Sequence, residues 1–228
     1  MSNLAMITQV ANALGDLKEE VVFVGGSVAE LYADYPEVTD IRPTIDVDCF
    51  LELRTYRNYS KLEERLRALG FKDDTSQGAP ICRKIYKGIK VDFMPDDERV
   101  LGFSNRWYAD GIRNKQECTL FDGTKIYILS VAYYLATKFE AMNGRGGADI
   151  RGSHDWEDIV YVMNNCAELV DAIRQCDNAL LVGYLQKQCA VLLSNGNIRE
   201  LIYTSLPYHS EEENVSEVLR VIEEIVKI

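Results

Sequence analysis

Three aspartates in two short apolar segments have the spacing of metal-binding carboxylates. Asp46 and Asp48 alternate with apolar residues, and Asp92 lies in the middle of a second apolar run. Because successive side chains of a strand point to opposite faces, Asp46 and Asp48 share one face and their apolar neighbours share the other. If the two strands are neighbours, the three carboxylates converge, and anions at such short range repel unless a cation lies among them. Oxygen ligands of this kind suit Mg²⁺ or Mn²⁺ and indicate phosphoryl or nucleotidyl transfer. The alternative is an ordinary solvated sheet face.

A glycine turn precedes the first aspartate pair. The apolar run 21–24 ends in Gly25, Gly26 and Ser27, and Ser27 is expected to cap a helix that continues to about residue 35. Glycine lets the backbone approach a ligand closely, and a helix N-terminus favours phosphate. The turn therefore predicts a site for the β- and γ-phosphates of a nucleotide. A simple tight connection between strand and helix is the alternative.

A second group of charged residues lies in the C-terminal half. Lys138 stands on an otherwise apolar helix, so its ammonium group either extends to solvent or binds a triphosphate. Asp155 and Asp158 share a helix face with apolar residues and therefore need a partner. Lys138, Arg145 in the glycine-rich segment 143–147, or a substrate group can be that partner. The alternative is that acids in the first turn only favour the helix dipole.

Composition limits the class of protein. The 228 residues carry a net charge of −11, which argues against broad non-specific binding of nucleic acid and leaves room for a local basic patch. No apolar run reaches the length of about 18 residues that a membrane span needs, and no signal peptide is expected at the N-terminus. The six cysteines form no CxxC pair. We expect reduced, buried thiols in a cytoplasmic protein without membrane association.

Hydrophobic periodicity predicts an α+β protein with a soft boundary between residues 129 and 130. The expected domains are a core at 1–129, with a small mixed sheet flanked by helices, and a helical bundle at 130–228 that completes a nucleotide cleft. The expected elements of the first domain are helices at 4–17, 27–35 and 59–69, strands at 21–24 and 44–53, and hairpins of 81–86 with 89–94 and of 118–121 with 125–129. Helices follow from residue 130, with Ser130 and Ser153 as caps and a last helix at 215–228.

Several of these motifs, taken in order, resemble one known family. The matching segments are Gly25-Gly26-Ser27, Arg42-x-Thr44-x-Asp46-x-Asp48, Val91-Asp92-Phe93, Lys138 and His154-Asp155-x-x-Asp158. This order resembles the AbiEii-type nucleotidyltransferases of the DNA polymerase β-like superfamily, which include toxins of type IV toxin–antitoxin and abortive-infection systems. The resemblance covers about residues 21–164, and His154 stands where the family often has a lysine.

The resemblance implies roles for the residues. Asp46 and Asp48 would bind metal together with the triphosphate, Asp92 would complete the site and help to activate an acceptor hydroxyl, and Lys138 would neutralise phosphate. The residues expected to bind nucleotide or substrate are Gly25, Gly26, Ser27, Arg42, Thr44, Arg145, Asp155 and Asp158. The residues expected on the acceptor side are Asn105, Arg106 and Tyr108.

The expected activity is Mg²⁺- or Mn²⁺-dependent transfer of NMP from an NTP to a hydroxyl. The acceptor is an RNA end such as that of a tRNA, a protein side chain or a small molecule, and an antitoxin is a possible partner. One alternative is a catalytically inactive module of the same fold that binds a nucleotide or a partner. Another is a helical adaptor whose aspartates are only a solvated sheet face.

Overall fold

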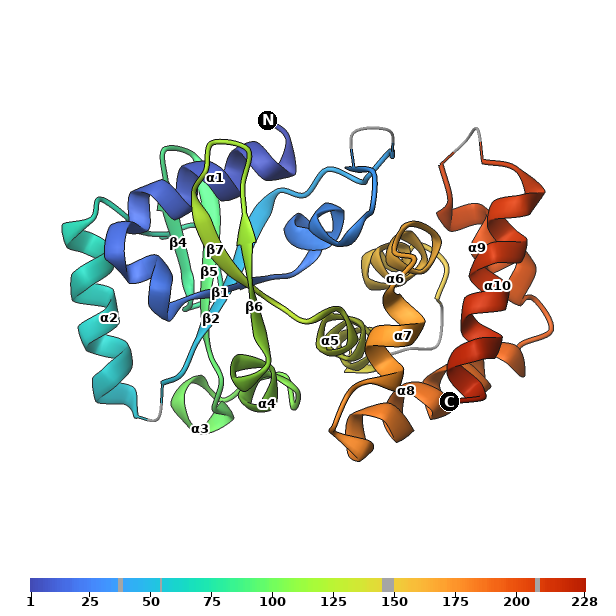
Figure 1. Ribbon diagram of the computed structural model, residues 1–228. Helices are drawn as coiled ribbons and strands as arrows, with labels where there is room; N and C mark the ends of the chain where they lie inside the picture. The colour runs from blue at the N-terminus through green and yellow to red at the C-terminus, as the bar shows by residue number, and fades with distance from the viewer. Residues whose placement is uncertain (37–38, 54, 145–149, 208–209) are drawn as a thin grey trace. The chain divides into compact units, whose positions relative to one another are not determined.

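Runs of β-branched and aromatic residues form a mixed sheet in the N-terminal half of the chain (Figure 1). The computed structural model describes residues 1–36, 39–53, 55–144, 150–207 and 210–228. Within these ranges seven strands form one sheet in the order β3-β4-β5-β2-β1-β7-β6. The strands are β1 (Val22–Val24), β2 (Asp46–Leu51), β3 (Lys72–Asp73), β4 (Arg83–Tyr86), β5 (Ile89–Pro95), β6 (Lys115–Thr119) and β7 (Lys125–Leu129).

The two aspartate-bearing strands are neighbours, which is the condition for their carboxylates to converge. β2 runs parallel to β5, with Asp48 opposite Asp92 and Asp46 opposite Lys90. β1 pairs with the other edge of β2 in antiparallel orientation, with Val24 opposite Asp48. The strand expected at 44–53 is shorter, and Ile45, which was expected on its apolar face, is 74% exposed because β2 begins only at the next residue.

The hairpin between β4 and β5 also follows the prediction. Its two turn residues, Lys87 and Gly88, have φ values of 47° and 85°. Positive φ at both positions is the geometry of the two-residue turns that match the twist of the flanking strands. The turn sets an antiparallel register in which Arg83 of β4 lies opposite Asp92 of β5.

Short helices accompany the sheet. The α-helices are α1 (Asn3–Leu14), α2 (Tyr56–Ala68), α3 (Glu98–Leu101) and α4 (Tyr108–Arg113), and the 3₁₀ helices are η1 (Gly15–Glu20) and η2 (Gly26–Tyr32). α1 packs against β2. The helix expected at 4–17 is divided because Gly15, at φ 54°, ends α1 and a 3₁₀ segment follows.

The C-terminal half is helical, as predicted. Its helices are α5 (Val131–Gly144), α6 (His154–Asn165), α7 (Leu169–Arg174), α8 (Ala179–Leu193), α9 (Ile198–Ser205) and α10 (Glu212–Val226). Ser153 caps α6 by accepting a hydrogen bond from the N–H of Trp156. α5 packs on α6 and α8, and α10 packs on the same two helices through a buried stripe that includes Val218, Ile222 and Ile225. The α+β class is therefore confirmed.

The chain forms two compact units, which we call the sheet unit (Met1–Val28 with Pro43–Ser130) and the helical unit (Ala29–Arg42 with Val131–Ile228). The segment Ala29–Arg42 groups with the C-terminal helices instead of with the sheet. In this segment the N–H of Asp34 donates to the carbonyl of Asn165 at 2.9 Å, and the hydroxyls of Thr39 and Tyr161 lie 2.6 Å apart. In the described part of the chain, no helix combines the length and apolar character needed to cross a membrane.

Candidate functional site

The carboxylates of Asp46 and Asp92 meet at one point on one face of the sheet. Both lie within hydrogen-bond distance of a single nitrogen, Nη2 of Arg83, at 2.9 Å from Asp46 Oδ2 and 2.7 Å from Asp92 Oδ2. Asp48 shares the strand face of Asp46 and lies opposite Asp92 in the register. The sheet unit therefore gathers three acidic side chains and one guanidinium, which we call the carboxylate cluster (Asp46, Asp48, Arg83 and Asp92).

Arg83 is the member of this cluster that the sequence analysis missed. Its Nε donates to Asp92 Oδ1 at 2.8 Å, so the guanidinium grips both oxygens of Asp92 and extends across β5 to Asp46. This fork-shaped contact is the strong form of an arginine–carboxylate bond. The hydrogen bond with Asp92 is the main cause that raises the pKa of Arg83 above its usual value, and the charges of Asp92, Asp46 and Asp48 add to it while burial opposes it. The guanidinium therefore stays charged.

Gly25 is required by the position of Asp48. Its φ is 75°, and a Cβ atom built there would lie 2.0 Å from Asp48 Oδ2. The chain makes this close approach because Val24, the residue before Gly25, is the register partner of Asp48. The glycine turn thus lies directly beside the carboxylate cluster.

The helix predicted after this turn is wrong in type. η2 begins at Gly26 as a short 3₁₀ helix, so Ser27 lies inside it and does not cap an α-helix. The Ser27 side chain is buried, and its hydroxyl donates to the carbonyl of Val24 at 3.4 Å. The tighter winding fits the abrupt change of direction at Gly25. The turn therefore offers no α-helix N-terminus to a phosphate group.

Thr44 fixes the start of β2. Its N–H donates to Oδ1 of the buried Asn3 at 2.9 Å, and its hydroxyl donates to the carbonyl of Asp46 at 3.1 Å. These bonds connect the residues before β2 to α1, so Thr44 orders the segment that precedes Asp46. Any contact of Thr44 with a nucleotide stays a prediction.

The residues expected on the acceptor side belong to α4 and the turn before it. The ring of Tyr108 stacks on Phe50 at a centroid distance of 4.3 Å. Phe50 follows Asp46 and Asp48 at the strand period of two, so Tyr108 lies along the same face of β2. The Asn105 side chain accepts a hydrogen bond from the N–H of Trp107, and the guanidinium of Arg106 lies 4.5 Å from the Trp107 ring centroid.

Lys138 is buried in the helical unit and does not extend to solvent. Its Nζ lies 2.6 Å from Asp158 Oδ2 and 3.3 Å from Asp155 Oδ1. Asp158 also accepts a hydrogen bond from Arg42 Nη2 at 3.3 Å. These four residues, Arg42, Lys138, Asp155 and Asp158, form what we call the helical ion network. It joins the segment before β2 to α5 and α6.

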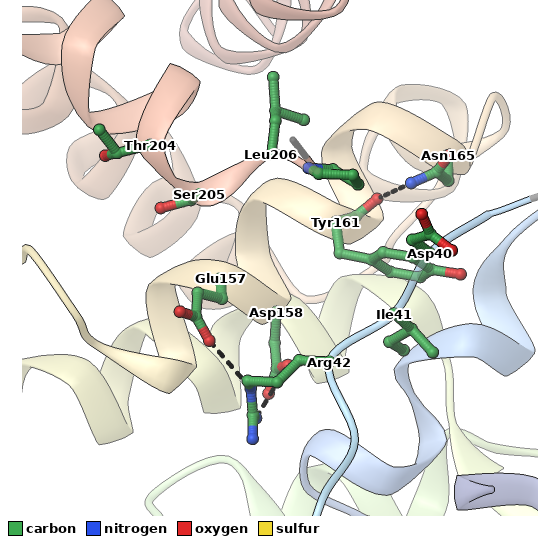
Figure 2. Close-up of a pocket in the computed structure, with 11 residues that line it drawn as sticks. Asp40, Ile41, Arg42, Glu157, Asp158, Tyr161, Asn165, Thr204, Ser205 and Leu206 are labelled. Carbon is green, nitrogen blue, oxygen red and sulfur yellow. Dashed lines mark hydrogen bonds and ion pairs between the residues drawn. The ribbon is translucent and has the colours of Figure 1, made fainter. Parts of the chain in front are cut away.

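Arg42 forms part of the wall of a pocket of about 360 Å³ in the helical unit (Figure 2). Figure 2 shows its guanidinium between two acids of α6, and Arg42 Nε lies 2.9 Å from Glu157 Oε2. Tyr161 also lines this pocket, and its carbonyl accepts a hydrogen bond from Asn165. The charge of Arg42 is therefore balanced by protein carboxylates in this structure. Arg145, the remaining basic candidate, lies outside the described residues.

Tyr134 packs beside the helical ion network. Its ring centroid lies 5.7 Å from Lys138 Nζ and 4.6 Å from the ring centroid of Tyr32. Burial raises the pKa of its hydroxyl well above the usual value, and the nearby charge of Asp158 raises it further. Tyr134 is thus a neutral, packed wall for the ion pairs, with no tendency to act as an acid or base near neutral pH.

The carboxylate cluster fits a hard divalent cation by its donor chemistry. Asp46, Asp48 and Asp92 offer carboxylate oxygens on one face, and Gly25 leaves room for the Asp48 carboxylate. Among the described residues, no three His, Cys, Asp or Glu side chains are arranged to hold a metal ion in this conformation. In this conformation the guanidinium of Arg83 lies between Asp46 and Asp92.

Comparison of the chain with models of protein families finds no match, and comparison with curated proteins finds none either. The functional assignment consequently rests on the geometry of the carboxylate cluster and on the motif order described above.

Proposed function

We propose that this protein is a metal-dependent nucleotidyltransferase of the AbiEii type, which moves NMP from an NTP to a hydroxyl. The observation that carries the proposal is the meeting of Asp46 and Asp92, from adjacent strands, on the sheet face shared by Asp48 and next to Gly25. A solvated sheet face requires no such convergence of like charges, which repel at this range.

Each group in the cluster has a role in this reaction. Mg²⁺ bound by Asp46, Asp48 and Asp92 would neutralise and orient the triphosphate. Asp92 accepts the proton of the acceptor hydroxyl as its oxygen forms a bond to the α-phosphorus. The bond from that phosphorus to the bridging oxygen breaks, and pyrophosphate leaves. The turn at Gly25 and Gly26 provides backbone without side chains where the triphosphate would lie.

The helical ion network has a different role in this proposal. Lys138 already has two carboxylate partners, Asp155 and Asp158. We assign the network to holding α5, α6 and the segment before β2 in place. In a direct contact of Lys138 with a triphosphate, which the resemblance implies, the phosphate would share the ammonium group with these two carboxylates.

The test is transfer of label from α-³²P-labelled NTPs in the presence of Mg²⁺. Three acceptor pools are supplied separately: tRNA, protein, and small hydroxyl compounds. We expect label in one pool, and a loss of at least about 10³-fold for Asp48→Asn, because a metal ligand contributes several kcal/mol to the transition state. Asp16→Asn is the matched control, since Asp16 is an exposed aspartate of the same unit outside the cluster. Transfer that Asp48→Asn leaves undiminished would contradict the proposal.

The bonds of Arg83 favour one second candidate, a nucleotide-binding module without turnover. A guanidinium that permanently occupies Asp46 and Asp92 would keep the metal away from two of its three ligands. That module would bind an NTP without forming product in any acceptor pool. A toxin assigned to the AbiEii type would instead transfer label, and co-expression with a cognate antitoxin would suppress the transfer.

A further inference from the structure

Arg83 stands where a metal ion would have to bind. Its Nη2 is shared between Asp46 Oδ2 and Asp92 Oδ2, at 2.9 Å and 2.7 Å, and its Nε takes the remaining oxygen of Asp92 at 2.8 Å. A Mg²⁺ ion binds carboxylate oxygens at about 2.0–2.1 Å in a near-octahedral shell. The guanidinium and a cation that bridges Asp46 and Asp92 therefore exclude each other.

Removing Arg83 leaves its partners in an unfavourable state. Only 10% of the Asp92 side chain and 26% of the Asp46 side chain are exposed. Asp48 adds a third carboxylate to the same face, directly opposite Asp92. Without a positive charge beside them, these carboxylates repel each other, and water reaches them too little to compensate for the repulsion. A cation at this position, whether guanidinium or metal, therefore stabilises the folded protein.

We propose that Arg83 is a positioning residue that holds Asp46 and Asp92 together until a divalent cation takes its place. This inference rests on the proposed function, since it concerns the same carboxylates. Arg83 keeps the two acids close in the metal-free protein and so prepares the ligand geometry. The same bonds weaken the affinity for metal, because a binding ion must first displace them.

The test compares the affinity for Mn²⁺ of the wild type and Arg83→Gln, measured by isothermal titration and by the EPR signal of free Mn²⁺. We expect the variant to bind Mn²⁺ about tenfold more tightly, because a charge-assisted fork no longer competes for the carboxylates. The matched control is Lys90→Gln. Lys90 lies opposite Asp46 in the β2–β5 register, and its strand position places it on the sheet face of the carboxylate cluster. Lys90→Gln therefore removes one positive charge from this face and keeps the two-point contact between Arg83 and Asp92. We expect Lys90→Gln to change the affinity by less than about threefold.

A purely structural arginine predicts a different pattern. Arg83→Gln should lower the unfolding temperature without metal and show a larger rise on saturation with Mn²⁺ than the wild type, because an ion that binds the folded state stabilises it. An arginine that only braces the sheet would give the loss of stability with unchanged or weaker affinity for Mn²⁺. That result would overturn the inference.

A second measurement covers the case in which Arg83→Gln does not fold. In wild-type protein the Nε–H resonance of Arg83, followed by ¹⁵N–¹H NMR, should shift and exchange faster with solvent when Mg²⁺ saturates the site. A resonance that saturating Mg²⁺ leaves in place would overturn the inference.

If the wild type binds Mn²⁺ and Arg83→Gln binds it equally, only this inference fails. If neither protein binds Mn²⁺, the proposed function fails together with it.

Discussion

The two charged clusters of this protein differ in charge balance and in exposure to solvent. The carboxylate cluster of the sheet unit has three acids against one guanidinium, and its Asp46 side chain is 26% exposed. The helical ion network has two aspartates and two cations, with Glu157 at its edge. In the network, the side chains of Lys138, Asp155 and Asp158 are no more than 8% exposed, and that of Arg42, at the pocket wall, is 26% exposed.

The difference indicates which cluster is built to receive a ligand. A closed, nearly neutral network satisfies its own members, so its main contribution is to fix helices in one arrangement. A cluster of three acids and one guanidinium holds like charges together, which is unfavourable unless a further cation binds. Groups held in such an unfavourable state are characteristic of functional sites. The comparison therefore supports the proposal of metal binding in the sheet unit and of a structural role for the network in the helical unit.

The largest expected effect tests the structural role of the network. Lys138→Met removes the ammonium group that lies within 3.3 Å of both Asp155 and Asp158 and leaves these two carboxylates buried. We expect a loss of about 3–5 kcal/mol in the free energy of unfolding of the helical unit, the usual cost of breaking a buried ion pair from one side. Urea denaturation followed by fluorescence measures it. The chain has two tryptophans, of which Trp156 is buried in the helical unit, so a Trp107→Phe background reports on this unit.

The control for this substitution is Lys187→Met, which changes an exposed lysine of α8 in the same unit. A surface position of this kind should shift the free energy of unfolding by less than about 0.5 kcal/mol. If Lys138→Met lowers the free energy of unfolding as little as Lys187→Met does, the buried ion pairs contribute little to stability. The contrast between the two clusters would then disappear.

A smaller change in the free energy of unfolding is expected when one aspartate from each cluster is replaced by asparagine. Asp158→Asn removes the acid that both Lys138 and Arg42 contact, and we expect a loss of about 1–3 kcal/mol in the free energy of unfolding. Asp48→Asn removes one of three repelling carboxylates and should leave stability unchanged or slightly higher. Urea midpoints of both proteins without divalent metal give the comparison. Equal losses at the two positions would show that the sheet cluster is also structural.

The sequence predicted the sheet elements that carry the cluster because strand period and turn type are local properties. Asp46 and Asp48 alternate with buried residues, and Lys87 and Gly88 have the chemistry of a two-residue turn. Arg83 was missed although the same turn contained the signal. Counting back from a turn at 87–88 pairs Tyr86 with Ile89 and therefore Arg83 with Asp92. The register that a turn at 87–88 imposes is thus a local signal for the pairing of Arg83 with Asp92.

Other features depend on tertiary context and could not be predicted from the local sequence. The segment Ala29–Arg42 follows a strand of the sheet unit, yet Arg42 finds its partners, Glu157 and Asp158, more than 100 positions later. The chain takes a φ of 75° at Gly25, beside Asp48, and η2 begins directly after it as a 3₁₀ helix. A search for helix caps cannot detect that constraint, so Ser27 was assigned a role that its buried hydroxyl does not have.

The smallest expected effect tests the packing at the edge of the carboxylate cluster. Gly25→Ala places a methyl group where Asp48 Oδ2 lies, at a backbone φ of 75° that L-residues rarely adopt. We expect a loss of about 1–2 kcal/mol in the free energy of unfolding from the strained backbone and the displaced carboxylate. Gly78→Ala is the matched control, because Gly78 has a φ of 83° with no atom within 4 Å of the added Cβ. It should show the backbone cost alone, and only Gly25→Ala should also weaken binding of Mn²⁺, measured by titration. If Gly25→Ala retains the wild-type affinity for Mn²⁺, the absence of a side chain at Gly25 is not needed for Asp48 to bind the ion. The glycine turn would then have no role in metal binding by the carboxylate cluster.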